Sequence, residues 1–391
     1  MKRTHFAAVA LTSAALLLTA AVAGPLDPPA GPVTSSYKTL LDVEPRIAIN
    51  ATNTPGDSTS LFRITAPGSY YLTGNVAGVS GKAIITIANP TQVGVDIDFN
   101  GFKLSGGTSA VVCSLNQESV RVHDGFITGA TGTGMNLSNV DRARVEGISI
   151  YGAATGIAAA HSATIQNCSV TAVTTGILVS DNSIVKDCSV EDASVNGVQC
   201  DSGCVISNCT SRACTGDGFR IAGSNSTLSH CAAFQCGAHG VETGLNNVVE
   251  NCTVGYANGS GYLLGPQCTI RDCSADNCTA QGIVVQGGGT VLNNQCKANG
   301  AGNSAGIWIQ GTNSHVEGNN VVANGYGIYV SGLFNLIIRN RASTNSQANY
   351  YIGASNEFGP LVNAGVNSVV VSGSSAAGTL GSTDPNANFS Y

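Results

Sequence analysis

The most regular feature of the chain is a glycine followed by alternating apolar and variable residues. Copies of this pattern begin at Gly176, Gly197, Gly218, Gly240, Gly261, Gly282, Gly306 and Gly327. In each copy the first and third residues after the glycine are mostly apolar, whereas the second varies in character. A period of two predicts a short β-strand with one buried face and one outward face. Asn, Ser and Gly, which favour tight turns, separate the strands.

A second regularity is a column of cysteines that becomes a column of asparagines. Its members, spaced 20 to 25 residues apart, are Cys168, Cys188, Cys209, Cys231, Cys252, Cys273, Asn294, Asn319 and Asn340. A further column lies five residues later in the same repeats and contains Cys214, Cys236, Cys278, Asn299, Asn324 and Asn345. Self-similarity at a fixed period indicates a solenoid, in which each repeat packs on its neighbours.

The repeat predicts an all-β, single-stranded right-handed parallel β-helix. A leucine-rich repeat also has an Asn or Cys position, but it requires a leucine framework and often a helical return segment. Here the apolar positions are mainly Val and Ile, and the returns are rich in Gly, Ser and Asn. We expect about 11 or more coils of about 21 residues, stacked about 4.8 Å apart.

The pattern divides the chain into four segments. Residues 1–23 are predicted to be a signal peptide, because Lys2 and Arg3 precede an apolar run and a small-residue cleavage site. Residues 24–60, which are rich in proline, are predicted to form an N-terminal arm and cap. Residues 61–355 form the β-helix, and residues 356–391 form a C-terminal tail. We therefore expect an exported protein, secreted, periplasmic or on the cell surface, with no membrane span after signal cleavage.

Charge limits the class of partner. The chain carries a formal net charge of −6, and only 10% of its residues are charged. Removal of Lys2 and Arg3 with the signal peptide makes the chain still more acidic. An acidic protein lacks the basic surface that binds nucleic acid, so no nucleic-acid partner is expected. Neutral glycans remain compatible with this composition.

Two further stretches carry a family resemblance. Residues 67–75 (PGSYYLTGN) and 95–104 (VDIDFNGFKL) resemble the entry coils of secreted right-handed β-helix proteins of the pectate-lyase-like superfamily. The ending DPNANFSY, residues 384–391, is similar to that of uncharacterised bacterial members. Many proteins of this superfamily bind or cleave carbohydrates. The resemblance implies a polysaccharide or cell-envelope glycan as partner, but a fold alone does not identify an activity.

Polar residues on three adjacent coils form the candidate site for chemistry. If the strands stack as predicted, one edge of one sheet carries Asn196, Gln199, Asp217, Arg220, His239 and Glu242. Asp217, His239 and Glu242 are the candidate catalytic residues, because carboxylates and an imidazole at this separation can perform acid–base chemistry on a sugar. Asn196, Gln199 and Arg220 are candidate ligand-binding residues. The alternative is a solvated polar turn with a surface ion pair between Arg220 and Glu242.

The polygalacturonase branch of the superfamily provides only a partial match to this site. That branch uses Asn-x-Asp, Asp-Asp, Gly-His-Gly and Arg-x-Lys motifs on successive coils. The chain has Gly216-Asp217-Gly218, without the second Asp, and Ala238-His239-Gly240, without the first Gly. Neither of the two flanking motifs is present. The likeness therefore leaves catalysis, glycan binding and a purely structural role all open.

Two other groups of residues are candidates for binding. Trp308 and Tyr329 occupy outward positions on successive coils, where they either stack on sugar rings or pack beneath the C-terminal tail. Asp96, Asp98 and Asn100 alternate along one strand and could hold Ca²⁺ through their oxygens, or form a polar outer face. The neighbouring His123 and Asp124 are expected to point to opposite faces of their strand.

Fourteen cysteines in an exported chain suggest disulfides, but the spacing suggests stacked thiols. Cys and Asn share two columns, so most cysteines are interpreted as small buried side chains of a ladder. A set of several bridges is the alternative, with Cys200 and Cys204 as the best candidate pair. No metal site built on cysteine is expected, because no compact Cys/His quartet is present.

Three classes of function follow from this pattern. The favoured class is a glycan-binding or extracellular scaffold protein that requires no cofactor. The alternative is a polysaccharide hydrolase or lyase acting on a groove along the β-helix. An ice-binding or adhesive solenoid needs a regular outward array, whereas the outward column here includes residues as different as Arg220, Leu263 and Trp308.

Overall fold

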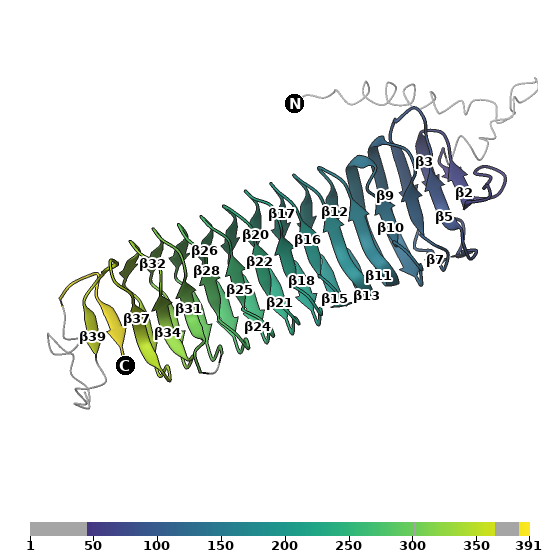
Figure 1. Cartoon of the computed structure of the whole chain (residues 1–391). Coiled ribbons are helices and arrows are strands. Elements are labelled where there is room, and N and C mark those ends of the chain that lie inside the picture. The colour runs from purple at the N-terminus through teal and green to yellow at the C-terminus, as the bar shows by residue number, and fades with distance from the viewer. Residues whose placement is uncertain (1–44, 301, 364–382) are drawn as a thin grey trace, which may run out of the picture. The chain divides into compact units, whose positions relative to one another are not determined.

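The computed structural model describes residues 45–300, 302–363 and 383–391, and within these ranges every element is a β-strand. Strands pair in parallel from one coil to the next, and the coils follow one another along a single axis (Figure 1). The chain makes about 15 turns with a repeat of about 21 residues. The predicted all-β parallel β-helix of 11 or more coils is thus confirmed. Residues 1–44, which include the predicted signal peptide, lie outside the described ranges.

Each coil contributes one strand to each of three parallel stacks. Stack 1 contains β1 (Ile47–Ala48), β3 (Gly68–Tyr71), β6 (Val95–Asp98), the start of β9 (Gln117–Thr128), the start of β11 (Val140–Ala159), β12 (Thr164–Gln166), β14 (Ile184–Lys186), β17 (Val205–Ser207), β20 (Thr227–Ser229), β23 (Val248–Glu250), β26 (Thr269–Arg271), β29 (Thr290–Leu292), β32 (His315–Glu317), β35 (Leu336–Ile338) and β38 (Glu357–Phe358).

Stack 2 contains β4 (Val76–Ala77), β7 (Lys103–Ser105), parts of β9 and β11, the start of β13 (Ser169–Val179), β15 (Ser189–Ala193), β18 (Thr210–Arg212), β21 (Ala232–Phe234), β24 (Thr253–Gly255), β27 (Ser274–Asp276), β30 (Gln295–Lys297), β33 (Asn320–Val322), β36 (Arg341–Ser343), β40 (Asn388–Ser390) and β39 (Leu361–Asn363). Stack 3 contains β2 (Ser60–Ile64), β5 (Ala83–Ile87), β8 (Val111–Cys113), β10 (Met135–Leu137), the ends of β11 and β13, β16 (Val198–Cys200), β19 (Phe219–Ile221), β22 (Val241–Thr243), β25 (Tyr262–Leu264), β28 (Ile283–Val285), β31 (Ala305–Ile309), β34 (Tyr326–Val330) and β37 (Ala348–Ile352).

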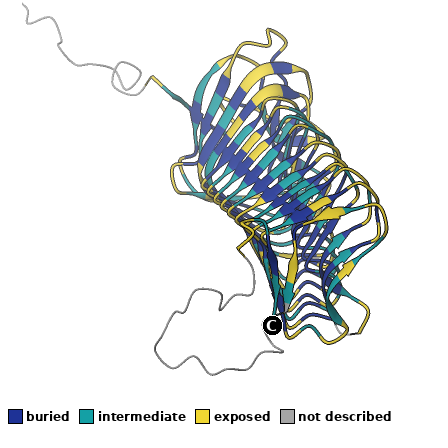
Figure 2. Cartoon of the chain, turned by 90° about the vertical axis from the view of Figure 1, so that its left-hand side faces the viewer, coloured by how far each residue is buried: buried dark blue, intermediate teal, exposed yellow. Residues whose placement is uncertain are grey.

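The register keeps apolar residues in line along the axis. Val185 pairs with Ile206, and Ile206 pairs with Leu228, so the middle residue of each short strand in stack 1 faces the core. All three side chains are fully buried. Figure 2 shows that buried positions run along the strands, whereas exposed positions gather at the connections. Because side chains alternate along a strand, the residues on either side of the middle one face outward.

A single residue in the left-handed conformation makes each bend between stacks 1 and 2. Asn167, Asp187 and Asn208 occupy this position on successive coils, with φ values of 54°, 55° and 53°. Asn and Asp tolerate positive φ better than other residues with side chains, because their short polar groups bond locally. This preference explains why Asn or Asp precedes so many ladder cysteines in the sequence.

The residue after each bend turns inward and satisfies the backbone of the preceding coil. The Oδ1 atom of Asn319 accepts a hydrogen bond of 2.9 Å from the backbone N–H of Asn294, and its Nδ2 donates to Val291 O at 3.0 Å. Cysteine makes the same two contacts with sulfur. Cys252 Sγ accepts from the Cys231 N–H at 3.5 Å and donates to Leu228 O at 3.7 Å. The thiols are therefore part of the ladder, with longer and weaker bonds than asparagine.

A third ladder, at the bend between stacks 3 and 1, was not predicted. Its composition is mixed, which hides it in the sequence. The Ser226 N–H donates to Asn247 Oδ1 at 2.8 Å, and the Asn247 N–H donates to Cys268 Sγ at 3.3 Å. Cys204 belongs to this ladder too, since its N–H donates to Ser226 Oγ at 3.0 Å.

All fourteen cysteines are buried free thiols in the structure, including the candidate disulfide pair. Cys204 Sγ donates to Ser180 O at 3.3 Å in the third ladder, whereas Cys200 faces the core from β16. These positions follow from two different requirements, a bend that needs a hydrogen-bonding side chain and a strand that needs an apolar one.

The C-terminal strand enters the stack out of sequence order. Strand β40 lies between β36 and β39, with Ser390 paired to both Ala342 and Asn363. Asn388 extends the asparagine ladder, because its Oδ1 accepts from the Asn340 N–H at 3.0 Å. Strands β38 to β40 fall in the segment predicted as a tail, and β1 falls in the segment predicted as an arm and cap. Among the described residues, no helix is long and apolar enough to span a membrane.

The ladder predicts a large difference between two neighbouring asparagines. Asn319→Ala leaves the buried Asn294 N–H without its acceptor and removes the bond to the Val291 carbonyl, so we expect a loss of about 1–3 kcal/mol in the free energy of unfolding. Asn320→Ala is the matched control, because the Asn320 side chain faces outward on β33. Urea unfolding of both variants measures the difference. Equal losses would contradict a special role for the inward position.

The buried thiols predict that stability falls at high pH. Burial raises the pKa of Cys113 to about 11, of Cys236 to about 12 and of Cys278 to about 11, from an ordinary value of 9.0. A raised pKa in the folded state means that the stabilisation is complete below pH 9. It is lost as pH rises through 11 to 12, by up to about 1.4 kcal/mol per pH unit for each thiol.

Urea midpoints measured between pH 8 and pH 11 test this expectation. The slope should become shallower in the Cys236→Ala variant, which removes one of the three thiols. A midpoint that does not change with pH would show that these thiols ionise equally in the folded and unfolded chain.

Candidate functional site

The predicted acid–base residues form another hydrogen-bonded column, at the entry to the strands of stack 3. Asn196 Oδ1 accepts from the Asp217 N–H at 3.0 Å, and Asp217 Oδ1 accepts from the His239 N–H at 2.9 Å. His239 Nδ1 in turn accepts from the Ser260 N–H at 3.0 Å. Each side chain thus caps the backbone of the next coil, which places Asn196, Asp217 and His239 close together, as predicted, but in contact with backbone.

These hydrogen bonds restrict the chemistry of Asp217 and His239. Asp217 is only 3% exposed, so little of its carboxylate faces solvent. Since Nδ1 of His239 accepts a hydrogen bond, the bond pattern assigns the ring proton to Nε2. Nδ1 is therefore not available to a substrate, and Nε2 is the atom left for any proton transfer.

The remaining predicted residues lie on the outward face beside this column. Arg220 on β19 lies 3.4 Å from Glu242 and 3.7 Å from Asp217 between charged atoms. Gln199 accepts from Asn196 Nδ2 at 3.1 Å. The pKa of the Glu242 carboxyl is raised. Burial is the main cause, and the nearby carboxyl of Asp217 is the second. The six predicted residues therefore form one connected network.

The aromatic residues near the C-terminal coils pack mainly on one another. The Tyr329 and Tyr351 rings are stacked, with centroids 4.5 Å apart and planes 9° apart. Tyr326 and Trp308 meet Tyr329 edge-on at 5.1 and 6.0 Å. Trp308 Nε1 donates to Ser331 Oγ at 3.0 Å. One face of the Tyr329 ring is thus covered by Tyr351, which leaves Trp308 as the better candidate for stacking on a sugar.

The predicted calcium ligands separate into two groups. Asp96 and Asp98 project from the outward face of β6, as expected. Asn100 lies in the following bend with φ of 52°, where its N–H donates to Asp98 Oδ1 at 2.6 Å. The expectation for His123 and Asp124 was wrong. Asp124 occupies the bend with φ of 59°, so its carboxylate turns back to His123 Nδ1 at 2.8 Å.

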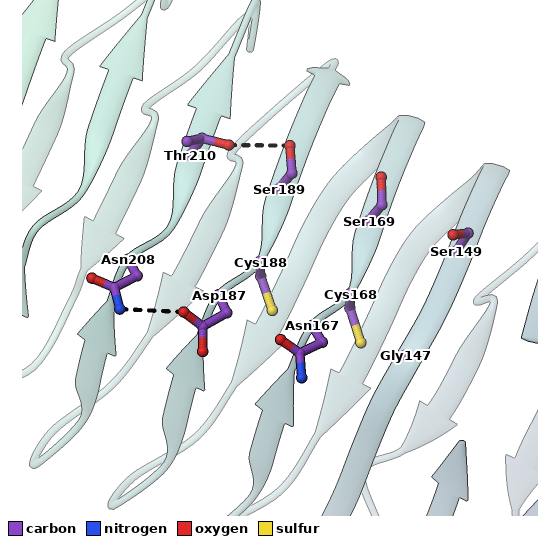
Figure 3. Close-up of a pocket in the computed structure, with 10 residues that line it drawn as sticks. All are labelled: Gly147, Ser149, Asn167, Cys168, Ser169, Asp187, Cys188, Ser189, Asn208 and Thr210. Carbon is purple, nitrogen blue, oxygen red and sulfur yellow. Dashed lines mark hydrogen bonds between the residues drawn. The ribbon is translucent and has the colours of Figure 1, made fainter. Parts of the chain in front are cut away.

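A groove that sequence reasoning missed runs along the bend between stacks 1 and 2. Figure 3 shows its two parallel rows of polar side chains, with two cysteine sulfurs at the bend. Hydrogen bonds link the coils at its rim, from Asn208 to Asp187 at 3.2 Å and from Thr210 to Ser189 at 3.1 Å. The hollow has a volume of about 540 Å³ and is lined by Gly147, Ser149, Asn167, Cys168, Ser169, Asp187, Cys188, Ser189, Asn208 and Thr210.

The groove reappears farther along the same bend. A second hollow of about 400 Å³ is lined by Asn251, Cys252, Thr253, Asp272, Cys273, Ser274, Asn293 and Gln295. The signal in the sequence is the hydroxyl residue after most ladder cysteines, as in Cys188-Ser189 and Cys209-Thr210. That residue starts a strand of stack 2 and faces outward, so its hydroxyl forms the wall of the groove.

Exposed aromatic residues lie along stack 2, whose outward face begins at the groove. Tyr151 is 62% exposed and lies two residues after Ser149 on β11, on the same outward face. Phe234 on β21 and Tyr256 in the bend after β24 are 39% and 51% exposed and pack edge-to-face at 5.1 Å. The outward face of stack 2 therefore carries hydroxyl groups where it meets the groove and aromatic rings farther along its strands.

The fold and this surface define an elongated β-helix with a polar groove parallel to its axis. Residues 185–321 match the family model described as "Right handed beta helix region", so the chain contains a right-handed β-helix, as predicted. No curated protein sequence matches the chain.

Several solved structures are similar to the chain at low sequence identity. The A-module of the mannuronan C-5 epimerase AlgE4 of Azotobacter vinelandii is 17% identical over 74% of this chain and 90% of that one, with a TM-score of 0.49. The periplasmic alginate epimerase AlgG is 11% identical over 81% of each chain, with a TM-score of 0.46. The catalytic domain of a GH87 α-1,3-glucanase is 12% identical over 78% of this chain and 66% of that one, with a TM-score of 0.44.

The hydrogen bond from the His239 N–H to Asp217 predicts different losses of stability for two substitutions at Asp217. Asp217→Asn keeps an oxygen that accepts from the His239 N–H, as Asn196 does for Asp217, so stability should change by less than about 1 kcal/mol. Asp217→Ala removes the acceptor and should cost about 1–3 kcal/mol. Chemical denaturation of the two variants tests this difference. Equal stability of Asp217→Ala and the parent chain would show that the cap contributes nothing.

Proposed function

We propose that the protein is an exported glycan-binding protein that holds a polysaccharide along the groove between stacks 1 and 2. The observation that carries the proposal is the groove itself, with hydroxyl and amide side chains repeated from coil to coil and aromatic rings farther along stack 2. It is long, open and polar, whereas sites for small ligands are mostly enclosed and apolar. A chain of sugars presents repeated hydroxyl groups that match such a surface.

The chemistry of the lining supports a neutral or weakly charged glycan. Serine and threonine hydroxyls both donate and accept hydrogen bonds, as sugar hydroxyls do. Asp187 and Asp272 are the acidic residues of the two hollows, and neither hollow is lined by Lys or Arg. Tyr151, Phe234 and Tyr256 add apolar surface for the faces of sugar rings. A polyanionic ligand would lack counter-charges in the groove.

The remaining parts of the proposal rest on the sequence. The basic and apolar start of residues 1–23 supports export, and the acidic composition supports a partner other than nucleic acid. We place the protein outside the cytoplasm, on the cell surface, in the periplasm or secreted, with a polysaccharide or cell-envelope glycan as its partner. An extracellular scaffold that uses the same groove for attachment belongs to this proposal.

The second candidate function is a polysaccharide hydrolase or lyase that uses Asp217, His239 and Glu242. The raised pKa of Glu242 favours it, because a general acid must stay protonated near neutral pH. The capping hydrogen bonds of Asp217 and His239 favour the binding function instead, because they hold both side chains against the backbone of the next coil. Stack 3 also contributes Trp308 and Tyr329 as an alternative binding surface.

Filling the groove with a bulky side chain tests the proposal. Ser189→Phe places a ring between the two rows of polar groups and should weaken binding to a retained polysaccharide at least tenfold. Gln199→Phe is the matched variant, because it places the same ring on the outward face of stack 3 beside the predicted acid–base residues. The measurement is binding of the mature chain to a panel of immobilised neutral and acidic polysaccharides.

The two variants give distinguishable outcomes. Loss of binding in Ser189→Phe alone supports the groove, and a weaker affinity in Phe234→Ala would add the aromatic rings of stack 2. Loss in Gln199→Phe alone would move the site to stack 3. Release of new reducing ends or unsaturated sugars by the parent chain, abolished in Asp217→Asn and Glu242→Gln, would establish the enzyme.

A further inference from the structure

A compact cluster of charged groups lies on the outward face of stack 1, in the N-terminal coils. Asp96 and Asp98 come from β6, and His123 and Asp124 come from β9 on the next coil, where Asp124 makes the bend within that strand. His123 is 8% exposed, although it sits on an outward face. In a chain with 10% charged residues, this concentration around a buried imidazole is unusual and independent of the proposed glycan groove.

The imidazole of His123 faces carboxylate oxygens on both of its nitrogen atoms. Nδ1 lies 2.8 Å from Asp124 Oδ2 and 3.7 Å from Asp98 Oδ1. Nε2 lies 3.4 Å from Asp96 Oδ1, a buried atom without a hydrogen-bond partner. A neutral imidazole has only one N–H, so neither tautomer can donate on both sides. A cation at one of the nitrogens removes this conflict.

The positions of the oxygens show which nitrogen a metal ion would occupy. Asp98, His123 and Asp124 each offer one ligand atom, and these atoms all lie within 4.8 Å of one another. Ligand atoms of a tetrahedral site with bonds of 2.0–2.2 Å are about 3.4 Å apart. The distances from Nδ1 to the two carboxylates, 2.8 and 3.7 Å, lie on either side of that value.

Asp96 supplies the second element of such a site. A histidine that binds metal through one nitrogen usually donates its other N–H to a carboxylate, which fixes the ring. With metal on Nδ1, the proton lies on Nε2 and points to Asp96 Oδ1, a buried oxygen that accepts no other hydrogen bond and has Arg121 at 3.8 Å. Ser69 Oγ already donates to the other oxygen of Asp96, at 3.1 Å, and so orients this carboxylate.

The surrounding charges leave the cluster acidic. Arg46 lies 2.6 Å from Asp98 Oδ2, on the oxygen that is not a candidate ligand. Arg121 lies 3.8 Å from Asp96 and 3.3 Å from Glu146, so its charge is shared between two carboxylates. Two guanidinium groups, one of them shared with Glu146, therefore face the three carboxylates around His123, and a divalent ion would add positive charge.

We infer that Asp98, His123 and Asp124 form a binding site for a divalent transition metal of the Zn²⁺ type, with Asp96 holding the ring of His123. The imidazole nitrogen selects this class of ion, because Ca²⁺ takes oxygen ligands. This set differs from the calcium ligands expected from the sequence, because His123 and Asp124 stand in place of Asp96 and Asn100 as ligands beside Asp98. Three protein ligands leave one tetrahedral position for an exogenous ligand.

Metal titration of the mature chain, stripped with a chelator and followed by calorimetry, tests the site. We expect one Zn²⁺ to bind per chain, and His123→Gln and Asp124→Asn to weaken binding at least a hundredfold. Asp96→Asn should weaken it about 10- to 100-fold, as expected for a carboxylate that orients a ligand. The control is His161→Gln, which alters an exposed histidine 3.6 Å from Asp181 and should leave binding unchanged.

Cobalt provides a readout that does not depend on affinity alone. Co²⁺ at the proposed site should give the visible absorption of nitrogen and oxygen ligation, without the intense charge-transfer bands of cysteine thiolates. Circular dichroism and thermal melts show whether each variant remains folded. The inference would be overturned if neither Zn²⁺ nor Co²⁺ bound, or if bound Co²⁺ gave thiolate bands. It would also be overturned if His161→Gln weakened metal binding as much as His123→Gln. Ca²⁺ binding that survives His123→Gln would also overturn it, as would an imidazolium ring at His123 in chains that bind no metal.

Discussion

The backbone at the bends sets the conditions for the rest of the structure. Strands hydrogen-bond from coil to coil, but at each bend the residue that turns inward would leave a buried N–H without a partner, which is costly. The inward side chain of the next coil supplies the acceptor, as Asn319 does for Asn294 and Cys252 does for Cys231. Both Asn and Cys fill the same space, so the column can change from one to the other along the axis.

This constraint also explains why cysteine, aspartate and histidine side chains can have a structural role here, although these residue types often take part in catalysis. Burial raises the pKa of thiols such as Cys236 and Cys278, and ladder sulfurs contact backbone carbonyls, as Cys252 Sγ contacts Leu228 O. Asp217 and His239 are in a comparable position, since each accepts a hydrogen bond from the next coil. At these equivalent positions of successive coils, a side chain is required for the hydrogen bond that it accepts from the backbone. Its capacity for acid–base chemistry is not what the position requires.

The outward surface is free of this constraint and carries the features that differ from coil to coil. The hydroxyl rows of the groove follow directly from the ladder, because the residue after each inward one must face outward. The cluster around His123 does not repeat, and it adjoins the groove at one end. A side chain added at Gly147, which lines the groove, would lie 2.9 Å from Asp124 Oδ1. The proposed metal site and the proposed glycan surface are therefore neighbours on the molecule.

The sequence by itself determined the fold class, the repeat length and two of the three ladders. Each coil buries the same positions, so the same residue types recur at these positions in every repeat. It also brought Asn196, Asp217, Arg220, His239 and Glu242 together correctly, since equivalent positions of successive repeats stack in a parallel β-helix. The third ladder was missed because Ser, Asn and Cys share that column and Gly289 interrupts it, so no single residue type recurs.

Only the tertiary structure decided what the side chains contact. Alternation along a strand predicted that His123 and Asp124 point apart, yet the positive φ of Asp124 bends β9 at that residue and turns its carboxylate back. The insertion of β40 between β36 and β39 is likewise invisible in the pattern, since it depends on pairing across a long separation in sequence. Periodicity fixes the coil in which a residue lies, whereas the bend geometry and the neighbouring coils decide which atoms it meets.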